Sequence, residues 1–453
     1  MKIGIDGIGL YIPQLTFNFP KEFCENRKQE KEKINKGLGI YEFRIPDYNQ
    51  DPVVLGANAI IKLIENNNYN PEDIKAIRVA TESGIDESKP IGTYILGILE
   101  EIYGNSFSHV ETDEMKFACI AGSFQLRNAV NSIKCREDKN AIEIVLTTDI
   151  ALYEKRDPGE VTQGAGAVAL GIKEKPRILD LSEISKNFVV STSDEYDFFK
   201  PDGRKTPIVD GKGSINCYLE RMKDAYDNFK KIYKKSHSEV DGKSPLEIFD
   251  RFVFHIPFPK MAEKAFSQLL IHEMRNKPEF SEIEKEIGKE PSKDSKEYYG
   301  WIKNFMETEY YKKSFEKKVK PSIEASQHIG NIYTGSIFLG LASLLEKEND
   351  ISEEKIAFGG YGSGASACAY YGIVQNEYKD AIKNISLFSQ IKEGQEINFE
   401  EYEKLHDWHI KAHDNIIISK QMYKRPYEIS LKEINNGKRI YNIKHQRIKQ
   451  VNL

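Results

Sequence analysis

Short runs of β-branched and apolar residues alternate along the chain with longer stretches of helical periodicity. Residues 75–81 (KAIRVAT) and 142–148 (IEIVLTT) have the length and composition of buried strands. Residues 57–65 and 124–133 carry apolar positions at helical spacing. Because strands that alternate with helices build layered sheets, the pattern predicts an α/β fold.

Two glycine-rich segments resemble each other: residues 163–171 (QGAGAVALG) and 361–372 (YGSGASACAYYG). Each combines a glycine turn with a strand of small and apolar residues. Glycine allows close approach of a ligand or of a neighbouring strand, and tight packing explains these glycines at least as well as function does. The weak repeat suggests two halves built on one plan, which we place at residues 1–174 and 175–453.

Two other regions differ from this plan. Between residues 277 and 320 the composition shifts to Glu and Lys, which predicts a solvated, partly helical insertion. After residue 420 the chain becomes basic, and two apolar runs flank Asn436-Gly437, a sequence that predicts a hairpin with a primed turn. The basic residues could meet a phosphate-bearing ligand, although a solvated face is the favoured interpretation.

Composition and charge exclude several classes of function. The chain has 453 residues, 40% of them hydrophobic and 30% charged, with a formal net charge of −5. These values allow a sizeable core and give no reason to expect nucleic-acid binding. Residues 1–10 predict a buried strand instead of an export signal, and the apolar stretch 332–345 is shorter than the roughly 20 residues of a membrane-spanning helix. We therefore expect no membrane association.

The cysteines are odd in number, widely scattered and without metal-ligand spacing. This usage predicts neither a disulfide framework nor a metal site, and it fits a reduced, cytoplasmic protein best. The five are Cys24, Cys119, Cys135, Cys217 and Cys368.

Cys119 is a candidate nucleophile because its segment, KFACIAGS, stands just before the helical run that begins at Phe124. The positive end of a helix lowers a thiol pKa and favours thiolate. Its free N–H groups can also receive the oxyanion that forms when a thioester carbonyl is attacked. Taken alone, a cysteine among small residues is more often simply buried.

Two further segments carry candidate acid–base groups. His255 ends the apolar run FVF before a proline, where a side chain can face a site, although a satisfied core histidine is the commoner outcome. Glu82 follows the strand 75–81 beside a glycine turn. A partly desolvated carboxylate at this place could act as a base near neutral pH.

Asn331 in GNIYTGS and Ser363 in GYGSG stand at turns before apolar runs. A helix cap explains Asn331 equally well, and a simple turn residue explains Ser363. Neither decides the function by itself.

Taken in order along most of the chain, these segments resemble the 3-hydroxy-3-methylglutaryl-CoA synthase family. The resemblance implies a thiolase-like fold with two pseudo-repeated halves, whose mixed β-sheets are layered between helices (αβαβα). Eight segments in the family's order are far more specific than any single motif. They are TESGIDESK, KFACIAGS, TQGAGAVAL, YDFFKPDG, PIVDGKGSINCYL, FHIPFPKM, GNIYTGS and GGYGSG.

The family reaction joins acetyl-CoA to acetoacetyl-CoA with water and yields 3-hydroxy-3-methylglutaryl-CoA and CoA, a step of the mevalonate pathway to isoprenoids. The resemblance makes Cys119 the acyl carrier, Glu82 the general base and His255, in its protonated form, the group that polarises the second substrate. The acetyl-cysteine forms first, Glu82 turns it into an enolate, and water frees the product.

The resemblance also implies substrate contacts and partners. It places Asn331 and Ser363 near the second substrate, and it implies a homodimer that needs neither a metal nor a redox cofactor. Two departures stand out: Ile120 follows the nucleophile where many relatives carry an aromatic residue, and the loop 154–160 does not align cleanly. Positions that shape or support the site are Asp149, Tyr153, Asp197 and Ser214, and positions that contact CoA are Thr162 and Lys260.

Three alternatives stay open at this level. A sister enzyme of polyketide branching performs the same addition on an acceptor bound to an acyl carrier protein, with the same three catalytic residues. A type III ketoacyl synthase shares Cys, His and Asn but lacks the Glu82 base, so TESGID disfavours it. A non-catalytic acyl-thioester-binding protein of the same fold would have no need for Cys119, Glu82 and His255 together.

Overall fold

The computed structural model describes residues 1–237, 243–275 and 277–445. Its centre is a mixed sheet of 10 strands, in the order β12-β13-β14-β8-β1-β7-β6-β4-β5, with β9 paired to β14. The strands are β1 Ile3–Tyr11, β4 Ile74–Ala80, β5 Glu111–Met115, β6 Ile142–Ala151, β7 Gly164–Glu174, β8 Leu179–Asp180, β9 Val189–Thr192, β12 Arg251–Phe254, β13 Lys355–Gly362 and β14 Ser366–Val374.

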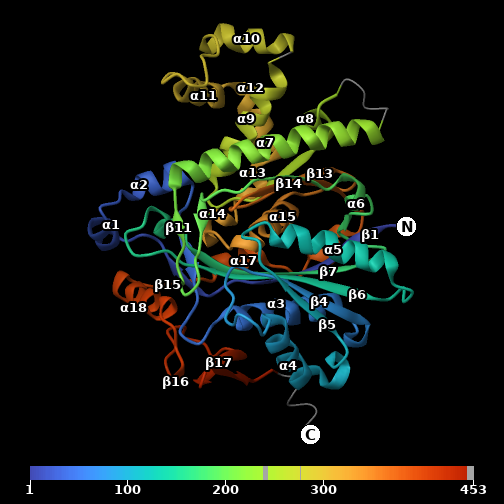
Figure 1. Ribbon diagram of the computed structural model, residues 1–453, viewed down its shortest axis with the longest axis vertical. Helices are drawn as coiled ribbons and strands as arrows, with labels where there is room; N and C mark the ends of the chain where they lie inside the picture. The colour runs from blue at the N-terminus through green and yellow to red at the C-terminus, as the bar shows by residue number, and fades with distance from the viewer. Residues whose placement is uncertain (238–242, 276, 446–453) are drawn as a thin grey trace.

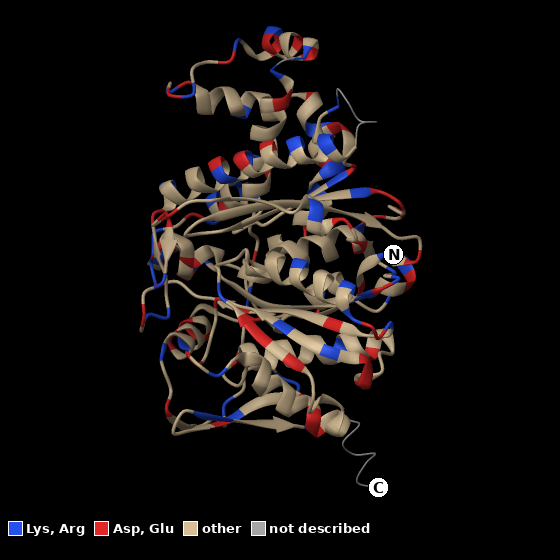
Figure 2. Ribbon diagram, turned by 45° about the vertical axis from the view of Figure 1, so that its right-hand side comes forward, with Lys and Arg blue, Asp and Glu red and all other residues tan. Residues whose placement is uncertain are grey.

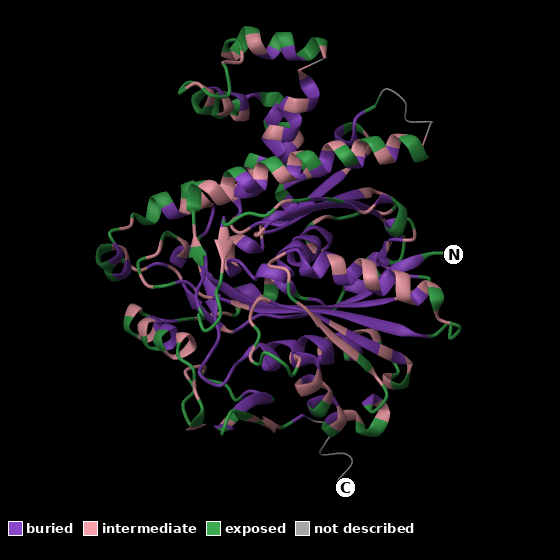
Figure 3. Cartoon of the chain, viewed as in Figure 1, coloured by how far each residue is buried: buried purple, intermediate pink, exposed green. Residues whose placement is uncertain are grey.

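The two-residue strand β8 joins two wings of this sheet. On one side it pairs with β1, and on the other it pairs with β14. The wings therefore fold over each other as two layers with helices α5 (Ala121–Cys135) and α15 (Ser336–Lys347) between them (Figure 1). Burial follows this arrangement, because α15 is buried along nearly its whole length while the outer helix α7 (Gly211–Ser236) exposes one face (Figure 3).

Helices also cover the outer face of each wing. Helices α3 (Pro52–Asn67) and α4 (Ile91–Tyr103) lie against the wing that holds β4 and β6, and α7 (Gly211–Ser236) and α9 (Lys260–Met274) lie against the other (Figure 1). The order helix, sheet, helix, sheet, helix confirms the thiolase-like αβαβα fold.

The local sequence explains where these elements begin and end. Helix α3 starts where the Asp51 side chain accepts a hydrogen bond from Val54 N, with proline in its first turn, and it stops at Asn68 in the left-handed conformation. The predicted strands 75–81 and 142–148 are confirmed as β4 and β6, and the predicted helices lie within α3 and α5. Each glycine-rich segment contains a strand, β7 or β14, that pairs antiparallel with the strand before it.

The charged insertion is helical and stands at one end of the molecule, beyond α9 (Figures 1 and 2). Its charged side chains face outward, while five aromatic side chains form a small core of their own that continues into the core around α9. The helices are α10 Pro278–Ile287, α11 Tyr298–Glu307 and α12 Glu309–Lys318, and the aromatic residues are Phe280, Trp301, Phe305, Tyr311 and Phe315.

The C-terminal hairpin is also confirmed. Strands β17 (Ile429–Asn435) and β18 (Lys438–Ile443) pair antiparallel, and Asn436 and Gly437 have φ values of 48° and 75°. Two positive values are those of a primed turn. The hairpin packs at the start of α3, where Arg439 pairs with Asp51 at 2.9 Å. A membrane-crossing helix is absent from the described part of the chain, because no helix there combines the length and the apolar character.

Candidate active site

The candidate nucleophile and base lie in contact. The Cys119 thiol donates a hydrogen bond to Glu82 Oε1 over 2.8 Å. Glu82 follows the carboxyl end of β4, and Cys119 lies two residues ahead of α5, so the central sheet and the central helix bring together positions 37 residues apart in the chain. A thiol and a carboxylate at hydrogen-bonding distance form a nucleophile–base pair.

The two groups change each other's acidity. Desolvation, followed by the nearby charge of Asp149, raises the pKa of Glu82 to about 7. Desolvation, followed by the charge and the hydrogen bond of Glu82, raises the pKa of Cys119 well above its ordinary value. The expectation that the helix end holds Cys119 as a thiolate is therefore wrong. The thiol keeps its proton and presents it to a carboxylate that titrates near neutrality.

The backbone around Cys119 is held by close packing. Ala118 has a φ of 42°, a left-handed conformation that is costly for a residue other than glycine and persists where the surroundings enforce it. Gly362 at the end of β13 approaches so closely that a Cβ there would lie 2.9 Å from the backbone N of Ile120. The Ile120 side chain is buried against this strand end. Ile120 thus serves to pack the nucleophile loop onto β13.

Asp149 holds the backbone of the candidate base, Glu82. Its carboxylate is fully buried near the end of β6 and accepts a hydrogen bond from the backbone N of Glu82 over 2.8 Å. Burial raises the pKa of Asp149, and several hydrogen bonds act in the opposite direction. The resemblance singled out Asp149 as a position that shapes or supports the site, and the structure places it against the backbone of Glu82.

Three aromatic rings stand together near this pair. Phe198 packs edge-on against Tyr153 and against Tyr333, with ring centroids 6.4 and 6.1 Å apart. Burial, followed by the charge of Cys119, raises the pKa of Tyr153. Tyr153 was a sequence candidate, but Phe198 and Tyr333 were not singled out. Both lie inside motifs that sequence reasoning had quoted, YDFFKPDG and GNIYTGS.

His255 comes from the opposite wing. It follows β12, its N–H donates to Gly359 O over 2.8 Å, and its carbonyl accepts a hydrogen bond from Tyr218 over 2.8 Å. The next residue, Ile256, exchanges hydrogen bonds with Ser336 at the start of α15. This anchoring fixes the histidine at the central helix of its own half.

The imidazole of His255 is deeply buried, and its Nδ1 has no hydrogen-bond partner among the described residues. Burial lowers the pKa of His255 to about 3. The expectation of a protonated His255 is therefore wrong. A neutral imidazole with a free ring nitrogen can still offer a hydrogen bond to a substrate oxygen.

Asp197 organises the turn that carries Ser363. It accepts hydrogen bonds from the Tyr361 hydroxyl over 2.7 Å and from the backbone N of Gly364 over 2.9 Å. The Ser214 hydroxyl reaches the same carboxylate at 3.4 Å. The candidates Asp197, Ser214 and Ser363 are thus neighbours at the end of β13.

A backbone hydrogen bond joins Asn331 in the second half to Thr162 in the first half. The backbone N of Asn331 donates to Thr162 O over 3.2 Å, and the Asn331 side chain accepts from Tyr333 N over 2.8 Å. This hydrogen bond stabilises the bend just ahead of the short 3-10 turn η6, Tyr333–Gly335, whose N-cap residue is Ile332, so Asn331 is the cap residue of neither η6 nor α15. The Thr162 hydroxyl donates to Gly159 O over 2.8 Å.

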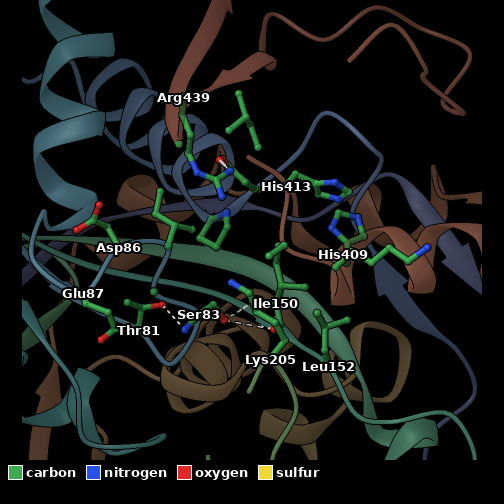
Figure 4. A pocket seen from close by; sticks show the side chains of 18 of the residues that line it. Thr81, Ser83, Asp86, Glu87, Ile150, Leu152, Lys205, His409, His413 and Arg439 are labelled. Carbon is green, nitrogen blue, oxygen red and sulfur yellow. Dashed lines mark hydrogen bonds and ion pairs between the residues drawn. The ribbon is translucent and has the colours of Figure 1, made fainter. Parts of the chain in front are cut away.

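Glu82 and Lys260 line different cavities. Glu82 and its neighbours Thr81 and Ser83 border a cavity of about 830 Å³ whose far wall carries Arg439 and other residues of the C-terminal region (Figure 4). Lys260, at the start of α9, borders a cavity of about 660 Å³ and pairs with Glu263 at 2.7 Å. Metal-ligating clusters of three or more His, Cys, Asp or Glu are absent from the described ranges.

The layered fold and the site at the head of its central helix define a thiolase-like enzyme that condenses acyl-CoA thioesters. Family models for the N-terminal and C-terminal parts of hydroxymethylglutaryl-coenzyme A synthase match residues 1–176 and 187–433. The chain belongs to the hydroxymethylglutaryl-CoA synthase family.

Individual relatives agree with the family models. A hydroxymethylglutaryl-CoA synthase of Haloferax volcanii is 36% identical, over 90% of this chain and 92% of that protein. A solved structure of MvaS in complex with 3-hydroxy-3-methylglutaryl coenzyme A is 29% identical with a TM-score of 0.83, covering 98% of this chain and 99% of that one. The HMG synthase of the curacin biosynthetic pathway has a TM-score of 0.81, covers 98% of this chain and 100% of that one, and at 23% identity shows a shared fold alone.

Proposed function

We propose that this chain condenses acetyl-CoA with acetoacetyl-CoA and water to 3-hydroxy-3-methylglutaryl-CoA and CoA, through an acetyl group carried on Cys119. The observation that carries the proposal is the 2.8 Å hydrogen bond from the Cys119 thiol to Glu82, within a fold of this family. One carboxylate next to one thiol can serve both steps of the reaction, the acetylation of Cys119 and the later condensation.

In the first half, Glu82 takes the thiol proton as Cys119 attacks the acetyl carbonyl. The carbon–sulfur bond to CoA breaks, and the CoA thiolate leaves with the proton that Glu82 returns. Backbone N–H groups at the start of α5 lie next to Cys119 and suit the oxyanion of this step. The products are acetyl-Cys119, free CoA and an ionised Glu82.

In the second half, Glu82 removes a proton from the acetyl methyl group, which its pKa of about 7 suits. The resulting enolate attacks the ketone carbon of acetoacetyl-CoA. His255, neutral and with a free ring nitrogen, stabilises the developing alkoxide by hydrogen bonding. The alkoxide takes up a proton, which offsets the one that Glu82 removed from the methyl group. Water then cleaves the thioester to Cys119: its oxygen passes to the product carboxylate, Cys119 regains its thiol proton, and one proton is released. We assign Asn331 and Ser363 to the second substrate.

CoA itself is proposed to approach through the cavity that Lys260 borders. Lys31 and Lys36 share this cavity with Lys260, and three cations suit the phosphates of CoA. Thr162 remains a proposed CoA contact. No metal or redox cofactor enters these steps.

The assembly and setting are further proposals. Strand β5 ends the large sheet, and within the described ranges it has a strand neighbour on one side only, so its other edge suits pairing with a second copy in a homodimer. All five cysteines are free thiols, in keeping with a cytoplasmic enzyme of the mevalonate pathway. We divide the chain at residues 174 and 175, with base and nucleophile in the first half.

Product identification tests the proposal most directly. The protein is incubated with acetyl-CoA labelled in the acetyl group and with acetoacetyl-CoA, and the product is identified by mass. Labelled 3-hydroxy-3-methylglutaryl-CoA, with transient label on the Cys119 peptide, is expected. Turnover only with an acceptor bound to an acyl carrier protein would instead assign the chain to polyketide branching, and absence of label on Cys119 would refute the covalent route.

A further inference from the structure

The two oxygens of the Asp149 carboxylate face different halves of the molecule. Within the described part of the chain, Oδ1 accepts hydrogen bonds only from the loop that carries the base: from Glu82 N at 2.8 Å, from the Ser83 hydroxyl at 2.9 Å and from the Thr81 hydroxyl at 3.0 Å. Asp149 therefore sets the position of the backbone on which the Glu82 side chain is mounted.

The other oxygen depends on one residue. Among the described residues, the hydrogen bonds to Oδ2 come from Thr334 alone, from its backbone N at 3.1 Å and from its hydroxyl. The Thr334 hydroxyl also lies 3.0 Å from Ala80 O, at the end of β4, but it has a single proton, and the charged oxygen is the stronger acceptor. Thr334 is completely buried.

Close packing holds Thr334 in this place. It belongs to the 3-10 turn η6 of the second half, which the hydrogen bond from Tyr333 N to the Asn331 side chain and the left-handed Tyr333, with φ of 43°, direct toward β6. A Cβ at Gly122 would lie 2.7 Å from Thr334 O, so the turn also contacts the helix that follows the nucleophile. Thr334 thus contacts Asp149, which holds the Glu82 backbone, and Gly122, in the helix that follows Cys119.

We propose that Thr334 is a positioning residue, which holds the Asp149 carboxylate in place across the two halves and thereby fixes the base Glu82 against Cys119. The inference rests on the proposed function, because it assumes that Glu82 is the base. Nothing in the reaction requires Thr334 to touch the substrate.

The arrangement also controls charge. Hydrogen bonds to an ionised carboxylate keep its pKa down, and the charge of Asp149 in turn raises the pKa of Glu82. Losing the Thr334 hydroxyl should favour a neutral Asp149, so the pKa of Glu82 should fall. The other titratable or charged groups that face this cluster are Cys119, Tyr153, Tyr333, Glu114 and Lys200.

The test compares three variants of the full-length protein. Thr334→Val removes the hydroxyl while keeping the shape, and Thr334→Ser keeps the hydroxyl. Thr147→Val is the matched control, since Thr147 is an equally buried threonine of β6 whose hydroxyl donates to Val168 O instead. The measurements are the rate of labelled product formation over pH 5 to 9, a range of roughly two units on either side of neutrality, and the thermal unfolding midpoint.

Thr334→Val should lower the condensation rate roughly ten- to hundredfold, the range for a lost hydrogen bond to a charged group. The acid limb of its pH profile should move to lower pH. Thr334→Ser and Thr147→Val should keep the wild-type limb.

Two results would overturn the inference: a Thr334→Val profile that matches wild type, or a Thr334→Ser variant as impaired as Thr334→Val. If wild type itself forms no product, the proposed function fails instead. An unfolded Thr334→Val protein would leave the comparison of Thr334→Ser with Thr147→Val to decide, because the proposal requires both to retain the wild-type pH profile.

Discussion

The two halves of the molecule build their central helices in the same way but use them for different chemistry. Ala118 lies three residues ahead of α5, and Tyr333 lies three residues ahead of α15, and both have the left-handed φ, 42° and 43°. The residue that follows is Cys119 in the first half and Thr334 in the second. The nucleophile thus has a counterpart that binds the Asp149 carboxylate.

The same burial acts oppositely on the reactive groups of the two halves. Burial disfavours charge, so it raises the pKa of the acids Cys119 and Glu82 and lowers the pKa of the base His255. Cys119 and His255 are consequently both neutral near pH 7. Glu82, with a pKa of about 7, is the one of the three that changes its charge near neutrality. In the proposed reaction, the first half therefore moves protons, while the second half supplies neutral hydrogen-bond donors.

The largest effect on turnover should follow from replacing the Cys119 sulfur in the first half of the molecule. Cys119→Ser should lose overall turnover, because a serine hydroxyl is a much poorer nucleophile beside a base of this strength. Loss of labelled product and of peptide label measures this. Cys135→Ser, an exposed cysteine at the far end of the same helix, is the matched control and should behave as wild type. Normal turnover of Cys119→Ser would exclude an acetyl-cysteine route.

A smaller loss should follow from removing the base. Glu82→Ala should lower condensation by roughly two to four orders of magnitude, the range for a positioned base. It should slow the acetylation of Cys119 less than the condensation, because Glu82 takes the thiol proton in that step but is also one of the causes that hold the thiol pKa high. Peptide mass spectrometry and product assays separate the two steps, with Glu87→Ala in the same loop as the control. A folded Glu82→Ala protein that condenses at the wild-type rate would contradict the role assigned to Glu82.

Replacing His255 in the second half should lower the condensation rate without changing its dependence on pH. His255→Gln should lower condensation by roughly two to three orders of magnitude, as for a lost oxyanion donor. Because Glu82 must be ionised to act, the wild-type rate should rise with pH through about 7, and this limb should survive in His255→Gln. His255, with a pKa of about 3, should contribute no limb near its ordinary value. A limb that disappears with the histidine would show that His255 acts in its protonated form.

Sequence alone could place most of the fold and the central pair. Strand-like runs, caps and the Asn436-Gly437 turn are local signals, and β4, β6, α5 and the hairpin followed from them. The contact between Cys119 and Glu82 agrees with their positions at the ends of a central helix and strand. Elements with strong local patterns were therefore predictable.

Protonation states and supporting residues were not predictable in the same way. The thiol state of Cys119 and the neutral state of His255 depend on burial depth, which no local pattern records. Thr334 meets Asp149 across 185 positions of the chain, and a threonine in GNIYTGS carries no signal of that contact. Residues that act by joining the halves became visible only with the fold.

The smallest effect should come from a substitution in the cavity that Lys260 borders, which does not contain Glu82. Lys260→Ala should raise the KM for acetyl-CoA by only about two- to fivefold and leave kcat unchanged, because a half-exposed cation contributes at most about 1 kcal/mol to binding a phosphate. The Lys260–Glu263 pair at 2.7 Å sharpens the test. Glu263→Gln should release the lysine and lower KM, more so at low salt, whereas Lys264→Ala on the exposed side of α9 should do neither. A fall in kcat with unchanged KM in Lys260→Ala would place Lys260 in the chemistry, and would end the separation between a cavity that binds CoA and a site that moves protons.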